Sequence, residues 1–138
     1  MSINPRDLSR PHVWEAASAE ASGRTLLLLH GSGADEHDLL GLGRALDPTA
    51  NLLSPRGLVR VGGANRYFEM FSPGVYDEPA VVQNSAELAD FVWAASGEYD
   101  FDADNVYAVG FSNGANAAHS MLLLQPDALA GVVAFGTN

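Results

Sequence analysis

The chain has 138 residues, of which 47% are hydrophobic and 17% charged, a composition typical of one globular domain rather than of a disordered chain. It has no cysteine and no lysine, and its 17 acidic residues against 7 arginines give a net charge of −10. The missing cysteine excludes disulfides and thiolate metal sites, and the negative charge argues against nucleic acid or anionic membranes as partners. A high-salt cytoplasm and a GC-rich genome that favours arginine would each explain the missing lysine.

The first residues, MSINPRDLSRPHVWEAAS, lack the apolar core of a signal peptide. The longest aliphatic run, LLLL at 26–29, is far too short to span a membrane. We therefore expect a soluble, cytoplasmic protein with no membrane span.

The first half of the chain predicts three strands and one helix. A short strand is expected at 11–16, and the continuous apolar run TLLLLH at 25–30 is typical of a strand buried on both faces. After a glycine-rich loop, leucines at helical spacing predict a helix over 36–46, with Asp35 as its N-cap. The stretch NLLSP at 51–55 predicts the next strand.

Residues 56–79 are rich in glycine, proline and aromatics and show no sustained period, and irregular segments of this length are often functional. The elements expected after this segment are a helix at 80–95, a strand at 105–111, a helix at 113–125 and a strand at 131–135. Strands that alternate with helices indicate a mostly parallel sheet with helices on both faces. In such sheets the reactive groups gather beyond the carboxyl ends of the strands, where the loops after His30 and Phe111 are expected.

The stretch VGFSNGANAAHSM at 109–121 contains a G-x-S-x-G motif between a predicted strand and a predicted helix. In this context the serine lies at a sharp turn and acts as a nucleophile, which makes Ser112 the candidate catalytic residue. Gly110 and Gly114 have no side chains and allow the strand and the helix to approach each other. The alternative is a glycine-rich turn with an incidental serine, but the flanking elements favour the nucleophile.

The loop that follows the buried strand has the features of an oxyanion loop. A strand ending in His30-Gly31 leads into a glycine-rich turn, and the backbone amides of Ser32 and Asn113 are the candidate oxyanion donors. His30, Gly31 and Gly33 are expected to support this loop. A dinucleotide-binding fingerprint is the competing interpretation, but it requires a third glycine at position 36, where this chain has Glu36.

Four segments together resemble the phospholipase/carboxylesterase family of α/β-hydrolases, which is related to acyl-protein thioesterases. They are LLLLHGSGADEHDLLGLGRAL, SPRG, YFEMF and FDADNVYAVGFSNGANAAHSMLLLQPDALAGVV. The resemblance implies hydrolysis of short acyl esters or thioesters through an acyl-enzyme on Ser112, with no cofactor and no metal. It also implies that Tyr67, Phe68 and Phe71 border the acyl pocket, although all three could equally be core residues.

The resemblance also predicts that 1–138 is a single, partial α/β-hydrolase domain that lacks the last strands. The triad of this fold follows in the chain order serine, acid, histidine, but after Ser112 this chain has one acid, Asp127, and one histidine, His119. Neither is expected within reach of the serine. The remaining candidate base is His30, but the resemblance implies that this histidine is structural and braces the loop by hydrogen bonds. We therefore expect weak or absent activity unless a homodimer or a complementing C-terminal fragment supplies the acid and the histidine. The alternative is a non-catalytic domain that binds acyl ligands or a partner through the same cleft.

Overall fold

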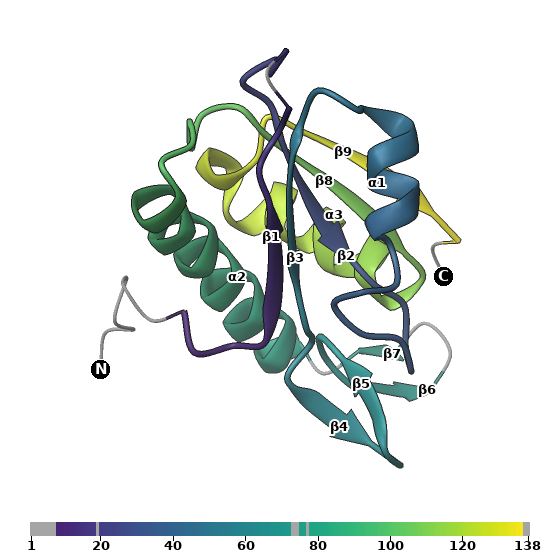
Figure 1. Ribbon diagram of the computed structural model, residues 1–138. Helices are drawn as coiled ribbons and strands as arrows, with labels where there is room; N and C mark the ends of the chain where they lie inside the picture. Colours follow the sequence, from purple (N-terminus) through teal and green to yellow (C-terminus); the bar gives the residue numbers. More distant parts are fainter. Residues whose placement is uncertain (1–7, 19, 73–74, 77, 137–138) are drawn as a thin grey trace.

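The computed structural model describes residues 8–18, 20–72, 75–76 and 78–136. Its main feature is a five-stranded sheet in the order β1-β3-β2-β8-β9 (Figure 1). These strands are β1 (His12–Glu15), β2 (Thr25–Leu29), β3 (Asn51–Pro55), β8 (Val106–Phe111) and β9 (Gly131–Phe135). The helices are α1 (Leu40–Leu46), α2 (Glu78–Tyr99) and α3 (Asn113–Leu124), followed by a short 3-10 turn at Pro126–Ala128.

The sheet is parallel except at one edge. Strand β2 pairs in parallel with both β3 and β8, and β8 pairs in parallel with β9. Only β1 runs antiparallel, against β3. The expected mostly parallel sheet is therefore confirmed, and among the described strands β9 forms the edge opposite β1.

The two faces of the sheet carry separate hydrophobic clusters because the side chains of a strand alternate between faces. On β2, Leu27 and Leu29 pack in the larger cluster with residues of α2 and α3. Leu26 and Leu28 pack on the opposite face, which α1 covers (Figure 1). Every residue of β2 is buried, which explains why this strand consists of aliphatic residues and one threonine.

Helix α1 packs mainly on β2 and β3, so the described residues cover the same face of β8 and β9 only in part. Phe111 is 49% exposed, Phe135, its partner in register, is 39% exposed, and Val133 is 45% exposed. We call this surface, formed by Tyr107, Phe111, Val133 and Phe135, the β8–β9 face. Apolar side chains gathered in this way are typical of a surface that another segment or molecule covers.

Two expectations about helix α1 were wrong in detail. Helix α1 begins at Leu40 rather than at Glu36, and Leu39 is its N-cap residue, without a side-chain cap. The carboxylate of Asp35 instead accepts a hydrogen bond from the backbone N–H of His37 at 2.9 Å, which stabilises the turn before the helix.

The segment 56–79 is not wholly irregular. It forms two short hairpins, β4 (Val59–Val61) with β5 (Ala64–Arg66) and β6 (Met70–Ser72) with β7 (Val75–Tyr76). The first hairpin turns at Gly62 and Gly63, both with positive φ, the conformation that a two-residue hairpin loop requires. Helix α2 then begins at Glu78 and is longer at both ends than the predicted 80–95.

Candidate active site

Ser112 lies at the sharp bend between β8 and α3. Its φ of 55° and ψ of −115° are backbone angles that residues other than glycine rarely adopt, and this conformation costs roughly 1–3 kcal/mol. Among the described residues, Asp100 is the one other non-glycine residue with a positive φ. The backbone N–H of Ser112 donates to the carbonyl oxygen of Phe135 at 2.8 Å, so the bend is also held by β9. A strained serine between a strand and a helix is the geometry of a nucleophile elbow.

The two glycines of the motif are required by close backbone approaches. A Cβ at Gly110 would lie 2.5 Å from the carbonyl oxygen of Gly114, inside the first turn of α3. A Cβ at Gly114 would overlap the carbonyl group of Leu29, at the end of β2. Both approaches place the start of α3 directly against the sheet. Ser112 therefore lies at the carboxyl ends of the parallel strands.

The glycine-rich loop after β2 lies against the elbow. A Cβ at Gly31 would be 3.0 Å from the ring of Phe111 and 3.5 Å from the Cβ of Ser112. Gly33, with a φ of 85°, turns the loop, and its N–H donates to the carbonyl oxygen of Asn65 at 3.0 Å. The two predicted loops are therefore next to each other in space.

The backbone N–H groups of Ser32 and Asn113 are the predicted oxyanion donors. Within the described part of the chain, neither group donates a hydrogen bond to a protein acceptor. Asn113 is the first residue of α3, where backbone N–H groups lack intrahelical acceptors and the helix dipole is positive. An oxyanion is a suitable acceptor for such groups.

His30 is buried beneath the loop, and both of its ring nitrogens are engaged. Its Nε2 accepts from the backbone N–H of Gly57 at 2.9 Å, so its Nδ1 carries the proton and donates to the carbonyl oxygen of Gly31 at 2.7 Å. Burial lowers the pKa of His30, which favours this neutral form. Its hydrogen bonds brace the loop, and no nitrogen is left to act on Ser112.

The aromatic residues predicted for the acyl pocket differ in their surroundings. Tyr67 is buried, and its hydroxyl donates to the carbonyl oxygen of Pro55 at 2.8 Å and accepts from the N–H of His30 at 3.2 Å. Phe68 is also buried and contributes to the wall of a cavity. Phe71 lies in β6, and its side chain is outside the described part of the structure.

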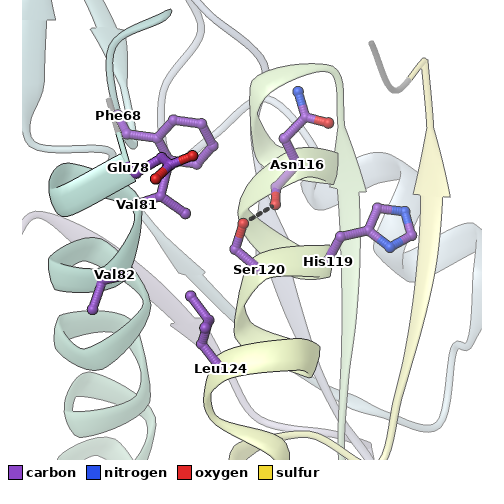
Figure 2. A pocket seen from close by; sticks show the side chains of 8 residues that line it. All are labelled: Phe68, Glu78, Val81, Val82, Asn116, His119, Ser120 and Leu124. Carbon is purple, nitrogen blue, oxygen red and sulfur yellow. Dashed lines mark hydrogen bonds between the residues drawn. The ribbon is translucent and has the colours of Figure 1, made fainter. Parts of the chain in front are cut away.

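The cavity of about 400 Å³ lies between α2 and α3 (Figure 2). It is lined by Phe68, Glu78, Val81, Val82, Asn116, His119, Ser120 and Leu124. Asn116, Ser120 and Leu124 follow at intervals of four residues along one side of α3, and Ser112, the N-cap residue, precedes Asn116 by the same interval. The cavity thus begins about one helical turn from Ser112, since the N–H of Asn116 donates to the carbonyl oxygen of Ser112 at 3.1 Å.

No hydrogen bond joins Ser112 to any of the four histidines, all of which belong to the described residues. His12 contacts Arg10 and Tyr99, whereas His37 is exposed beside Asp35. His119 is exposed, and in Figure 2 its ring points away from α2.

Two supporting interactions were not foreseen from the sequence. Glu36 is buried, and its carboxylate accepts two hydrogen bonds from the guanidinium of Arg56, at 2.7 and 2.9 Å. Asp35, Glu36 and His37 lie close enough to hold a metal ion, but Arg56 already neutralises the buried carboxylate. The side chain of Asn113 forms the second interaction, a bridge to Tyr67 and Phe68. The SPRG segment at 54–57 was the available signal for the first interaction, whereas nothing in the sequence indicated the second.

The parallel sheet, the elbow and the adjoining glycine loop define an α/β-hydrolase. No protein-family model matches the chain. The chain is 45% identical over 122 residues to the Bacillus subtilis protein "Putative hydrolase MhqD", an alignment that covers 88% of this chain and 60% of that protein.

Solved structures similar to this one include two carboxylesterases. The Bacillus cereus carboxylesterase has a TM-score of 0.90 and 39% identity, with 95% of this chain and 61% of that chain covered. A Mesorhizobium loti carboxylesterase has a TM-score of 0.84 and 33% identity, with 93% of this chain and 61% of that chain covered. The resemblance to phospholipase/carboxylesterase-like α/β-hydrolases is therefore confirmed. The chain spans about 60% of the length of these relatives.

Among the described residues, no helix has the length and apolar character needed to cross a bilayer. The expected cytoplasmic location stays a prediction, as does the assignment of 1–138 to a single domain.

Proposed function

We propose that this chain carries the nucleophile, the oxyanion hole and the acyl pocket of a serine carboxylesterase or thioesterase. The strained conformation of Ser112, next to the loop that carries Ser32, is the observation that supports this most strongly. The Ser112 Oγ attacks the carbonyl carbon of the ester and forms a tetrahedral intermediate. The N–H groups of Ser32 and Asn113 stabilise its oxyanion, at roughly 3–4 kcal/mol for each donor.

Collapse of the intermediate releases the alcohol or thiol, which takes up the proton lost by Ser112. Water then attacks the acyl-enzyme, and the carboxylic acid leaves as the serine regains its proton. In the first step a general base must lie within about 3.2 Å of the serine hydroxyl, and in the second the same base must take a proton from the attacking water. We propose that a histidine and its acid come from a C-terminal segment outside this chain, or from a second chain.

The substrates we propose are esters and thioesters with a short acyl chain. The cavity of about 400 Å³ lies within the range typical of small-molecule sites. Its apolar wall includes Phe68, Val81 and Leu124. The polar side chains of Asn116 and Ser120 line the same cavity, and Asn116, one turn of α3 from Ser112, would lie nearer the carbonyl end of such a substrate.

The β8–β9 face is the proposed contact for the missing partner. It adjoins the elbow directly, because Phe111 and the carbonyl oxygen of Phe135 flank the N–H of Ser112. A segment or a second copy that covers this face would therefore lie beside the nucleophile. Its apolar area would be buried on association, which favours the complex.

The test is hydrolysis of p-nitrophenyl acetate by this chain, and by this chain fused to the C-terminal part of a related carboxylesterase. We expect rates barely above background from the chain alone and ordinary esterase rates from the fusion, abolished by Ser112→Ala. A fluorophosphonate probe should label Ser112 in the fusion. If the fusion folds but neither hydrolyses the ester nor reacts with the probe, the proposed function is wrong.

A second candidate is a non-catalytic domain that binds acyl ligands. The observation that favours it is the engagement of both His30 nitrogens, which leaves the serine without a base among the described residues. Saturable binding of a short acyl ligand that Ser112→Ala leaves unchanged, together with an inactive fusion, would support this candidate.

A further inference from the structure

The side chain of Asn113 is buried and joins the elbow to the backbone of Tyr67 and Phe68. Its Oδ1 accepts a hydrogen bond from the backbone N–H of Tyr67 at 2.8 Å. Its Nδ2 donates to the carbonyl oxygen of Phe68 at 3.2 Å. Asn113 is only 7% exposed, so water cannot easily replace these partners.

The residues bridged in this way contribute to both parts of the proposed site. Tyr67 is anchored to the oxyanion loop through His30 and to the end of β3 through Pro55. Phe68 lines the cavity between α2 and α3. Asn113 follows Ser112 directly, and its bridge therefore connects the nucleophile to the wall of the cavity.

The chemistry of the bridge requires an amide on a short side chain. Asparagine supplies one acceptor and one donor, which matches the N–H of Tyr67 and the carbonyl of Phe68. Aspartate has the same shape but no donor, and its charge would face the Phe68 carbonyl. Alanine would leave the buried N–H of Tyr67 without an acceptor.

We propose that the Asn113 side chain is a positioning residue that holds Phe68, and with it the acyl cavity, in fixed register with Ser112. This role rests on the proposed function, because that function identifies the ligand of the cavity as the acyl chain of the ester. Asn113 then has two roles: its backbone N–H donates to the oxyanion, and its side chain fixes the position of the pocket wall at Phe68.

Asn51 provides a matched control at the other end of the sheet. It is also an asparagine with two bridging bonds, accepting from the N–H of Ala17 at 2.8 Å and donating to the hydroxyl of Thr25 at 3.1 Å. The variants to compare are Asn113→Ala, Asn113→Asp and Asn51→Ala. Asn113→Asp keeps the acceptor and the shape of the side chain. If Asn113→Ala fails to fold, Asn113→Asp takes its place in the binding measurement.

The first measurement is amide hydrogen exchange at Tyr67 in the unmodified chain and in each variant. We expect Asn113→Ala to lower the protection of this amide by about tenfold or more, because the N–H loses its acceptor. Asn113→Asp should retain the protection of Tyr67, and Asn51→Ala should leave it unchanged. Unaltered protection in Asn113→Ala, or an equal loss in Asn51→Ala, would overturn the proposal.

The second measurement is binding of 2-heptanone, a neutral ester analogue that cannot be hydrolysed, followed by NMR at Phe68. We expect Asn113→Ala and Asn113→Asp to weaken binding by about tenfold, the effect of one lost buried hydrogen bond on the pocket wall, and Asn51→Ala to leave it unchanged. Equal binding by all four proteins would refute the positioning role. If the unmodified chain does not bind the ketone while Tyr67 protection still depends on Asn113, the proposed acyl pocket fails and the positioning role stands.

Discussion

Replacing Gly114 with alanine should destabilise the fold strongly, because the new methyl group has no space. Its Cβ would overlap the Leu29 carbonyl and lie 2.5 Å from the carbonyl oxygen of His30, where ordinary contact begins at 3.4 Å. Both obstacles are backbone atoms at the end of β2, a strand paired on both sides, so they cannot move aside. Overpacking costs about 1–3 kcal/mol, and we expect the upper end of that range here.

The matched control is Gly97→Ala in α2. Gly97 is exposed, and a Cβ there would meet nothing within 4 Å. Alanine should stabilise this helix position by about 0.5–1 kcal/mol, because glycine loses more backbone entropy on folding.

Urea unfolding followed by circular dichroism measures both effects. For a chain of this size, about 3 kcal/mol corresponds to a fall in melting temperature on the order of 10 °C. The two substitutions are chemically identical, yet their free energies of unfolding should change in opposite directions. If Gly114→Ala were neutral, the close approach of α3 to β2, and with it the position of the elbow, would be wrong.

Three further predictions concern other parts of the molecule. Ser112→Gly should raise the free energy of unfolding by about 1 kcal/mol, because glycine adopts a positive φ without strain, and a loss of stability in urea unfolding would contradict the strained elbow. The hydrogen bond from Arg24 lowers the pKa of Asp47 from 3.8 to about 2, so this carboxylate stabilises the fold above pH 4 and the contribution is lost as the pH falls toward 2. Asp47→Asn should therefore lower the melting temperature at pH 6 but not at pH 2, and equal effects at both values would rule this out. Val133→Asp should abolish any self-association through the β8–β9 face in sedimentation velocity, and oligomers that persist in the variant would place the contact elsewhere.

The sequence predicted the elements that depend on local patterns. The run of leucines at 26–29 could only suit a strand covered on both faces, and the observed two clusters follow from it. The elbow was also predictable, because Gly110, Ser112 and Gly114 stand at the spacing that a strand–turn–helix corner requires.

The features that sequence reasoning missed depend on contacts between distant residues. Asn113 binds backbone atoms of Tyr67 and Phe68, but an exposed polar residue after Ser112 would have looked the same in the sequence. The later start of α1 has a similar cause: Glu36 is drawn into a buried pair with Arg56, twenty residues away, and does not join the helix. Tertiary contacts outweighed helix propensity there.

The β4–β5 hairpin joins an open turn at Gly62 to a fixed second strand, β5. At Gly62 nothing lies within 4 Å of where a side chain would begin, whereas Asn65 donates to the carbonyl of Ala34 at 3.0 Å and accepts from the N–H of Gly33. Peptides inserted at this turn should therefore leave the bend at Ser112 undisturbed, whereas changes at Asn65 would be transmitted to it through the glycine-rich loop. The hairpin offers protein engineers a site to add a new recognition element within the same fold.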